Sequence, residues 1–116
     1  MKGGISVHVV DVASGRVASG MRIEIHSLDP PALICDARTD EHGILPSPAL
    51  AGPFRPGRFE ARFHIADYYR AQNVVLAEVP FLDVSVYRFG IASKDQHYHL
   101  PLKMTPWGYS LFRGGA

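Results

Sequence analysis

The chain has 116 residues, a length that predicts a single domain spanning residues 1–116 with a sizeable apolar core. Apolar residues make up 47% of it and charged residues 20%, which is typical of a globular protein and argues against a disordered one. The net charge is only +1, so the basic surplus of a protein that binds nucleic acid or an anionic membrane is missing. No apolar run approaches the roughly 20 residues of a membrane span, no signal peptide is apparent, and the lone Cys35 cannot form an intrachain disulfide. We therefore expect a cytoplasmic protein with a buried cysteine and with neither nucleic-acid nor membrane partners.

Alternating apolar and polar residues predict three strands in the first third of the chain. Ile5, Val7 and Val9 share one face of the first strand, which leaves His8 on the opposite face. Prolines end the second strand, because proline has no amide proton to contribute to a sheet. The predicted elements are a strand at 4–11, a loop at 12–20, a strand at 21–28 stopped by 29–31, a weaker strand at 32–39 and a turn at 40–43.

The rest of the chain predicts further strands and one short helix. Phe59, Ala61 and Phe63 alternate with charged residues in the clearest strand pattern of the sequence. The predicted elements are a proline-rich connection at 44–57, strands at 58–65, 81–89, 97–104 and 109–113, a helix at 66–77 and a turn at 106–108. Seven or eight short strands and one helix predict an antiparallel β-sandwich, whose open edges favour a dimer or tetramer.

Histidines are expected on the polar faces of two of these strands. In the strand at 97–104 the apolar residues share one face, so His97 and His99 lie opposite the core, as His8 does in its own strand. Covered by another subunit, this face would become a semi-enclosed cleft. Histidine titrates near neutral pH, so two such side chains around a water molecule can act as general base and general acid.

Arg113 and the two glycines after it add to this chemistry. A guanidinium suits a planar anionic substrate or a developing oxyanion, and Gly114 and Gly115 let the backbone approach a ligand closely. Together with the histidines, these residues indicate hydrolysis of an activated cyclic amide. The sequence has neither a G-x-S-x-G nucleophile motif nor a phosphate-binding loop.

Plainer interpretations remain open for several of these residues. We expect His26, His42 and His64 to be surface residues without a role, and His97 could be structural, positioning its neighbour. The H-x-H pattern with one distant histidine is a weak zinc signal, so no metal site is expected. On spacing alone, solvated strand faces are about as compatible with the histidines as a functional cluster.

Motifs at both ends of the sequence resemble one known family. Residues 97–115 read HYHLPLKMTPWGYSLFRGG, which is similar to H-Y-H-V-P-L-L-L-S-P-Y-G-Y-S-T-Y-R-G-S in 5-hydroxyisourate hydrolases of the transthyretin-like family. The opening ISVHVVD at 5–11 and the GRVASGMRIE at 15–24 resemble that family's first signature. TDEHG at 39–43 and IADYY at 65–69 also match, so the resemblance covers nearly the whole chain.

This resemblance implies a fold, an activity and a set of site residues. The fold is a transthyretin-type (prealbumin-like) antiparallel sandwich, assembled as a homotetramer that is a dimer of dimers. The activity is cofactor-free hydrolysis of 5-hydroxyisourate to 2-oxo-4-hydroxy-4-carboxy-5-ureidoimidazoline, a step of purine catabolism on a small purine-derived substrate. His8 and His99 match the histidines that handle the attacking water, and Arg113 matches the arginine of the terminal motif. The positions implied to contact the substrate are Ile44, His97, Gly114 and Gly115.

Two positions depart from the family pattern. Ile44 stands where the family has an arginine after the T-D-x-x-G glycine, and the chain ends FRGGA rather than YRGS. Arg55 and Arg58 are candidates to replace the missing arginine. A non-enzymatic binding protein, like transthyretin itself, and a hydrolase of a related cyclic ureide are the alternatives.

Overall fold

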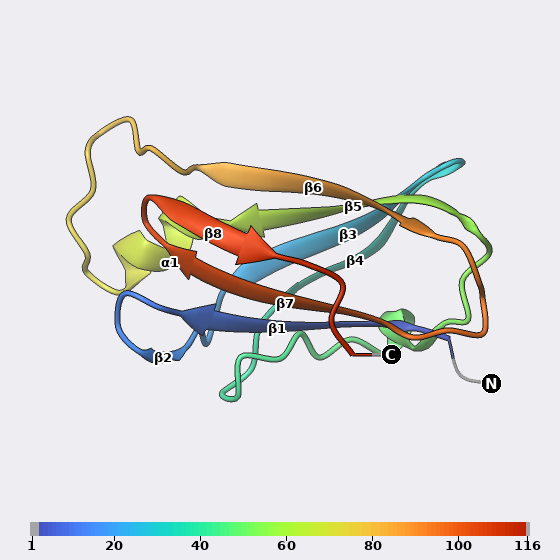
Figure 1. The fold of residues 1–116 in the computed structure, drawn as a ribbon. Coiled ribbons are helices and arrows are strands. Elements are labelled where there is room, and N and C mark those ends of the chain that lie inside the picture. Colours follow the sequence, from blue (N-terminus) through green and yellow to red (C-terminus); the bar gives the residue numbers. More distant parts are fainter. Residues whose placement is uncertain (1–2, 116) are drawn as a thin grey trace.

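The computed structural model describes residues 3–115 and folds them into two four-stranded sheets packed face to face (Figure 1). Met1, Lys2 and Ala116 lie outside the described residues, so the ends of the predicted domain and the last residue of the terminal motif are not covered. The elements are β1 (Ile5–Asp11), β2 (Arg16–Val17), β3 (Arg22–Leu28), β4 (Pro31–Arg38), the 3₁₀ helix η1 (Pro48–Ala51), β5 (Gly57–His64), α1 (Ile65–Ala71), β6 (Val84–Ile91), β7 (Tyr98–Thr105) and β8 (Gly108–Leu111). The predicted β-sandwich with one short helix is confirmed.

The order of the strands brings the two ends of the sequence together. One sheet has the order β2-β1-β7-β8 and the other β4-β3-β5-β6. Neighbouring strands are antiparallel except β1 and β7, which run parallel at the centre of the first sheet. A parallel pair needs a long crossover, and here the whole second sheet lies between the two strands in the sequence. The register places Ser6 opposite His99 and His8 opposite Pro101.

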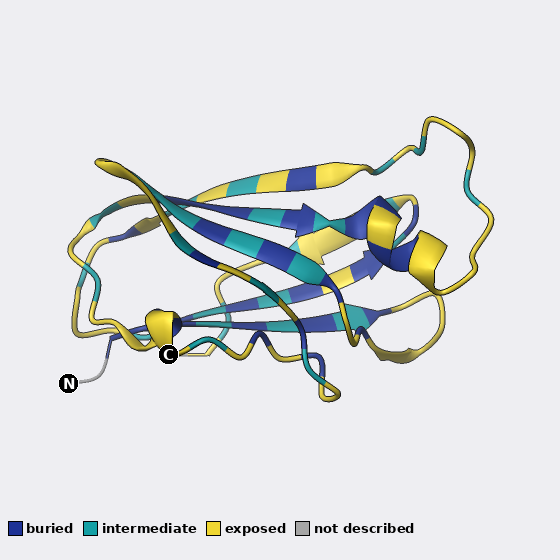
Figure 2. Ribbon diagram, turned by 180° about the vertical axis from the view of Figure 1, so that it is seen from behind, coloured by how far each residue is buried: buried dark blue, intermediate teal, exposed yellow. Residues whose placement is uncertain are grey.

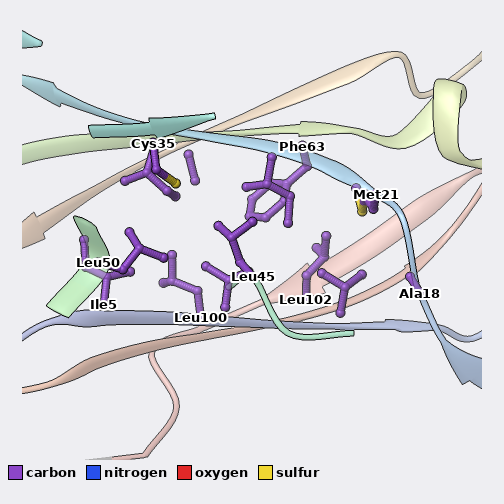
Figure 3. Close-up of a cluster of buried hydrophobic side chains, with 14 of the residues drawn as sticks. Ile5, Ala18, Met21, Cys35, Leu45, Leu50, Phe63, Leu100 and Leu102 are labelled. Atoms are coloured by element: carbon purple, nitrogen blue, oxygen red, sulfur yellow. The ribbon is translucent and has the colours of Figure 1, made fainter. Parts of the chain in front are cut away.

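The core lies between the sheets and follows the predicted alternation. Along β1 and β7 every second residue is buried, which Figure 2 shows as buried bands that alternate with half-buried or exposed ones. Figure 3 shows side chains of both sheets meeting in one cluster, with Phe63 and Met21 on one side and Leu100 and Leu102 on the other. Each such side chain contributes roughly 1.5–3 kcal/mol on burial. Because the apolar faces of β1 and β7 pack into this cluster, their histidines point outward.

Cys35 belongs to this same cluster, as predicted. Its side chain is buried, and burial raises the pKa of the thiol, so it remains protonated and unreactive near neutral pH.

Several boundaries differ from the predicted ones for local reasons. The predicted loop at 12–20 contains β2, which is only two residues long and therefore shows no alternation. The helix ends at Ala71 rather than at residue 77, because Asn73 adopts a left-handed conformation with φ of 63° and terminates it. The segment after it is irregular and exposes Val75 and Phe81, so β6 begins only at Val84. None of the described helices is long and apolar enough to cross a membrane.

Candidate active site

The outward face of β1 and β7 carries a cavity of about 440 Å³. Its lining residues are Ser6, Val7, His8, Ile44 and His99. The parallel register of the two strands assembles this set from both ends of the sequence. The predicted pair His8 and His99 is therefore brought to one cavity, together with Ile44.

The hydroxyl group of Ser6 lies between His99 of β7 and His97, which comes just before β7. The Ser6 Oγ lies 2.7 Å from Nε2 of His97 and 2.6 Å from Nδ1 of His99. The other nitrogen of His97, Nδ1, lies 3.0 Å from the Gly3 carbonyl oxygen. Both ring nitrogens of His97 are thus engaged by the protein, which supports the structural alternative for this residue and leaves neither nitrogen free for the predicted substrate contact.

His99 is set up to accept a proton. Burial lowers its pKa below the usual value of 6.5, and the nearby His8 and His97 lower it further. The ring is therefore neutral at pH 7. Because Ser6 engages Nδ1, Nε2 is the nitrogen left available to the cavity.

His8 is held by the predicted turn at residues 40–43. Its Nε2 donates to the His42 carbonyl oxygen at 3.0 Å, and Ile44 forms an antiparallel bridge with it. The Asp40 carboxylate accepts from the amides of His42 and Ile44, and these hydrogen bonds lower its pKa, the one from Ile44 most. The turn thus fixes the Ile44 side chain, which is 44% exposed, as an apolar wall beside His8.

The C-terminal segment packs directly against His99. After β8 the chain continues along β7, where the Gly114 amide donates to the His99 carbonyl oxygen at 2.8 Å. A Cβ atom at Gly114 would lie 3.0 Å from Cγ of Pro101 and 3.3 Å from Cδ2 of His99. Glycine avoids this crowding and lets the backbone approach the site closely, as the sequence predicted. Gly115 follows with a left-handed φ of 54°.

Arg113 does not join the cavity residues. Its guanidinium donates to Oε1 of Gln96 at 3.1 Å and to the His97 carbonyl oxygen at 3.3 Å. It also stacks over the ring of Tyr98, with Cζ 4.0 Å from the ring centroid. In this chain Arg113 therefore braces the backbone of His97 at the edge of the site.

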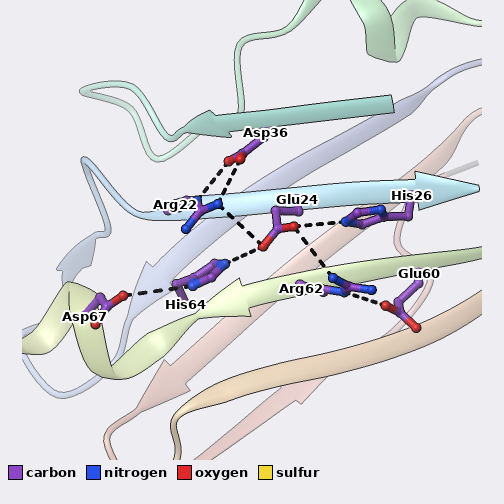
Figure 4. A network of polar contacts seen from close by, with 8 residues as sticks. All are labelled: Arg22, Glu24, His26, Asp36, Glu60, Arg62, His64 and Asp67. Carbon is purple, nitrogen blue, oxygen red and sulfur yellow. Dashed lines mark hydrogen bonds and ion pairs between the residues drawn. The ribbon is translucent and has the colours of Figure 1, made fainter. Parts of the chain in front are cut away.

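Two other histidines lie on an outer sheet face, as predicted, but they are partly buried there. His26 and His64 lie on the outer face of the second sheet, where Nε2 of each donates to the Glu24 carboxylate at 3.0 and 2.6 Å (Figure 4). Their side chains are only 19% and 11% exposed, because Arg22 and Arg62 close the same network around Glu24. His42 is on the surface as expected, with a side chain 72% exposed.

The two candidates to replace the arginine missing at position 44 lie away from the histidine cavity. Arg58 lies in β5 and lines a hollow with Arg88 and Phe89 on the second sheet. Arg55 lines another hollow with Phe54. Neither lines the histidine cavity. Among residues 3–115, no group of three or more histidine, cysteine or acidic side chains is arranged to hold a metal ion.

The sequence did not identify Ser6 or Gly3 as parts of the site. The alternation of the first strand did place Ser6 on the same face as His8, which is a signal in hindsight. Its partner His99 is fixed only by the register of β1 against β7, which no single strand reveals.

Comparison with known proteins gives matches over nearly the whole chain. A sequence model described as the HIUase/Transthyretin family matches residues 5–114. The 5-hydroxyisourate hydrolase of Pseudomonas aeruginosa is 44% identical over 115 residues, which cover 97% of this chain and 91% of that protein. Among solved structures, (S)-allantoin synthase matches with a TM-score of 0.92 and 36% identity, over 98% of this chain and 44% of that one. The 5-hydroxyisourate hydrolase of Klebsiella pneumoniae has a TM-score of 0.82 at 20% identity, over 97% and 99% of the two chains, which shows a shared fold.

Proposed function

The chain belongs to the HIUase/Transthyretin family, and we propose that it hydrolyses 5-hydroxyisourate to 2-oxo-4-hydroxy-4-carboxy-5-ureidoimidazoline. The observation that carries this proposal is the cavity that His8 and His99 share, in which His99 is neutral and offers Nε2. Curated relatives between 34% and 44% identical are named 5-hydroxyisourate hydrolase, which supports this substrate and a role in purine catabolism.

The reaction needs water and two proton transfers. His99 takes a proton from the water molecule as its oxygen bonds to the ring carbonyl carbon. The imidazolium of His99 then gives this proton to the leaving nitrogen while the carbon–nitrogen bond breaks, and the carboxylic acid that forms loses its remaining proton to solvent. His8, whose Nε2 donates to the His42 carbonyl oxygen, orients the water molecule by accepting from it at Nδ1. Water is the only co-reactant, and we assign no cofactor and no metal to the step.

Ile44 and the two C-terminal glycines bind and orient the substrate ring. Ile44 supplies an apolar surface against one side of the ring, and the backbone of Gly114 and Gly115 borders His99. His97 acts through Ser6, and Arg113 holds the His97 backbone. This division separates the groups that touch the substrate from those that position them.

We further propose that the chain acts as one domain in a cytoplasmic homotetramer, a dimer of dimers. The cavity is open on the outer face of a sheet, and a second subunit over it would exclude water from the reaction. Trp107 and Phe112 beside the edge strand β8, and Val86 on the edge strand β6, are exposed apolar residues of the kind that subunit contacts cover. The single buried cysteine supports a reducing compartment.

The test follows the loss of freshly generated 5-hydroxyisourate by its absorbance. We expect the protein to accelerate this loss above the spontaneous rate and the His99→Gln variant to abolish the acceleration. His26→Gln is the matched control, because it makes the same substitution on the opposite sheet and keeps a donor for Glu24. A wild-type protein that gives only the spontaneous rate would refute the proposal and favour the non-catalytic binding alternative. Turnover of a related cyclic ureide, without turnover of 5-hydroxyisourate, would favour the alternative that the protein is a hydrolase of that ureide.

A further inference from the structure

The donor and the acceptor can be assigned in each of the hydrogen bonds that link Gly3, His97, Ser6 and His99. A carbonyl oxygen only accepts, so the His97 Nδ1 that contacts the Gly3 carbonyl carries a proton. In a neutral ring Nε2 is then an acceptor, so the Ser6 hydroxyl donates to it at 2.7 Å. That uses the only proton of the hydroxyl, so at 2.6 Å Ser6 accepts from Nδ1 of His99. The lone pair of His99 is thereby left on Nε2.

We propose that Ser6 and His97 are positioning residues that hold His99 in the tautomer with its proton on Nδ1 and its lone pair on Nε2. This inference rests on the proposed function for its consequence, since only that tautomer can take a proton from water in the cavity. The free imidazole of histidine favours the opposite tautomer, with the proton on Nε2. We call the hydrogen bonds that run from His97 through Ser6 to His99 the relay. Without the relay, Nε2 of His99 would mostly carry the proton and could not accept one from water.

Both ends of the relay are anchored in backbone. The Gly3 amide donates to the Asp95 carbonyl oxygen at 3.2 Å. A Cβ at Gly3 would lie 2.3 Å from the Lys94 carbonyl oxygen, so only glycine fits there. At the other end, Gly114 covers the Cδ2 side of the His99 ring. The relay is thus a rigid arrangement between two glycine contacts, which is what a positioning device requires.

The ionisable groups facing His99 are His97, which comes just before β7, and His8 from β1, while the C-terminal segment brings the backbone of Gly114. Ser6 is the group that hydrogen-bonds to Nδ1 of His99, so its hydroxyl sets the tautomer of that ring.

A matched pair of substitutions isolates the hydroxyl of residue 6. Ser6→Thr keeps the hydroxyl, and Ser6→Val has nearly the same shape without it; both suit a strand. The side-chain nitrogens of the histidines are observed by ¹⁵N NMR near pH 8 without substrate, with His99 assigned by comparison with His99→Gln. We expect the Nδ1-protonated tautomer in the wild type and in Ser6→Thr, and predominantly the Nε2-protonated one in Ser6→Val. Ser6→Ala gives the same readout if the added methyl groups of valine disturb folding.

Kinetics on the same variants test the consequence. Partners that orient a reactive imidazole are worth about 10- to 100-fold, so kcat should fall by that amount in Ser6→Val and recover in Ser6→Thr, with KM unchanged. The inference is overturned if wild-type His99 is protonated on Nε2, or if valine and threonine give the same tautomer. Because the NMR measurement needs no turnover, it decides the inference even if 5-hydroxyisourate is not hydrolysed.

Discussion

Replacing Gly114 with alanine should impair the site through one atom. The new Cβ would lie 3.0 Å from Cγ of Pro101 and 3.3 Å from Cδ2 of His99, whereas carbon atoms prefer roughly 3.5–4.0 Å. The backbone of Gly114 is not in the left-handed region, so alanine adds no conformational strain there. Relief of the overlap requires a displacement of about 0.5 Å, and the His99 ring and the proline are the groups that must move.

The magnitude follows from that displacement. Since misplacing a reacting group by 1 Å can cost about 100-fold, half of that shift should cost about 10-fold in kcat/KM. Overpacking should also lower the free energy of unfolding by about 1 kcal/mol. The assays are 5-hydroxyisourate hydrolysis and denaturant unfolding.

The control is Gly57→Ala, where a Cβ would meet only ordinary contacts near 4.0 Å on the second sheet. We expect its kcat/KM to match the wild type. Equal kcat/KM in Gly114→Ala and Gly57→Ala would refute the reasoning, because it would mean that His99 does not depend on this contact.

Three predictions concern pH. Because the pKa of His99 is lowered, mainly by burial, the acid limb of kcat/KM should fall below pH 6.5, and a limb at or above 6.5 would contradict the assignment of His99 as the base. The unfolded chain binds a proton at His99 more readily than the folded one, so this residue should make stability rise with pH up to about 6.5, a rise that His99→Gln should reduce. On the other sheet, the hydrogen bond from His64 is the main cause that lowers the pKa of Glu24, so Glu24 stabilises the fold above about pH 4.5 and this contribution is lost as the pH falls through the lowered pKa. Acid unfolding of Glu24→Gln should show a weaker pH dependence in that range, and an unchanged acid transition would show that the network contributes nothing to stability.

The sequence predicted those features of the fold that show in the residue pattern of a single strand. Alternation in β1, β5 and β7 revealed which side chains face the core, since the period of a strand is two residues. It could not reveal β2, which is too short to alternate, or the end of α1, which depends on the backbone conformation of Asn73. Local pattern therefore predicted faces well and boundaries less well.

The site divides in the same way. His8 and His99 could be selected from strand faces and from the family motifs, and both reach the cavity. The partnership of Ser6 with His99 depends on the register of two strands more than ninety residues apart, and the place of Arg113 depends on the path of the chain after β8. Both are tertiary properties, so no local sequence pattern contains them.

The two sheets carry two histidine clusters, and their partners distinguish them. On the second sheet His26 and His64 both donate a hydrogen bond to the Glu24 carboxylate, which lies in a network of charged side chains (Figure 4). On the first sheet His99 faces a hydroxyl, and His97 a hydroxyl and a carbonyl, so no carboxylate stabilises an imidazolium there through these bonds. A carboxylate partner favours the imidazolium form of a ring, which has no lone pair to accept a proton, whereas a ring whose partners are a hydroxyl and a carbonyl keeps its lone pair near neutral pH. The polar partners of the histidines therefore identify the face of β1 and β7 as the one suited to proton transfer.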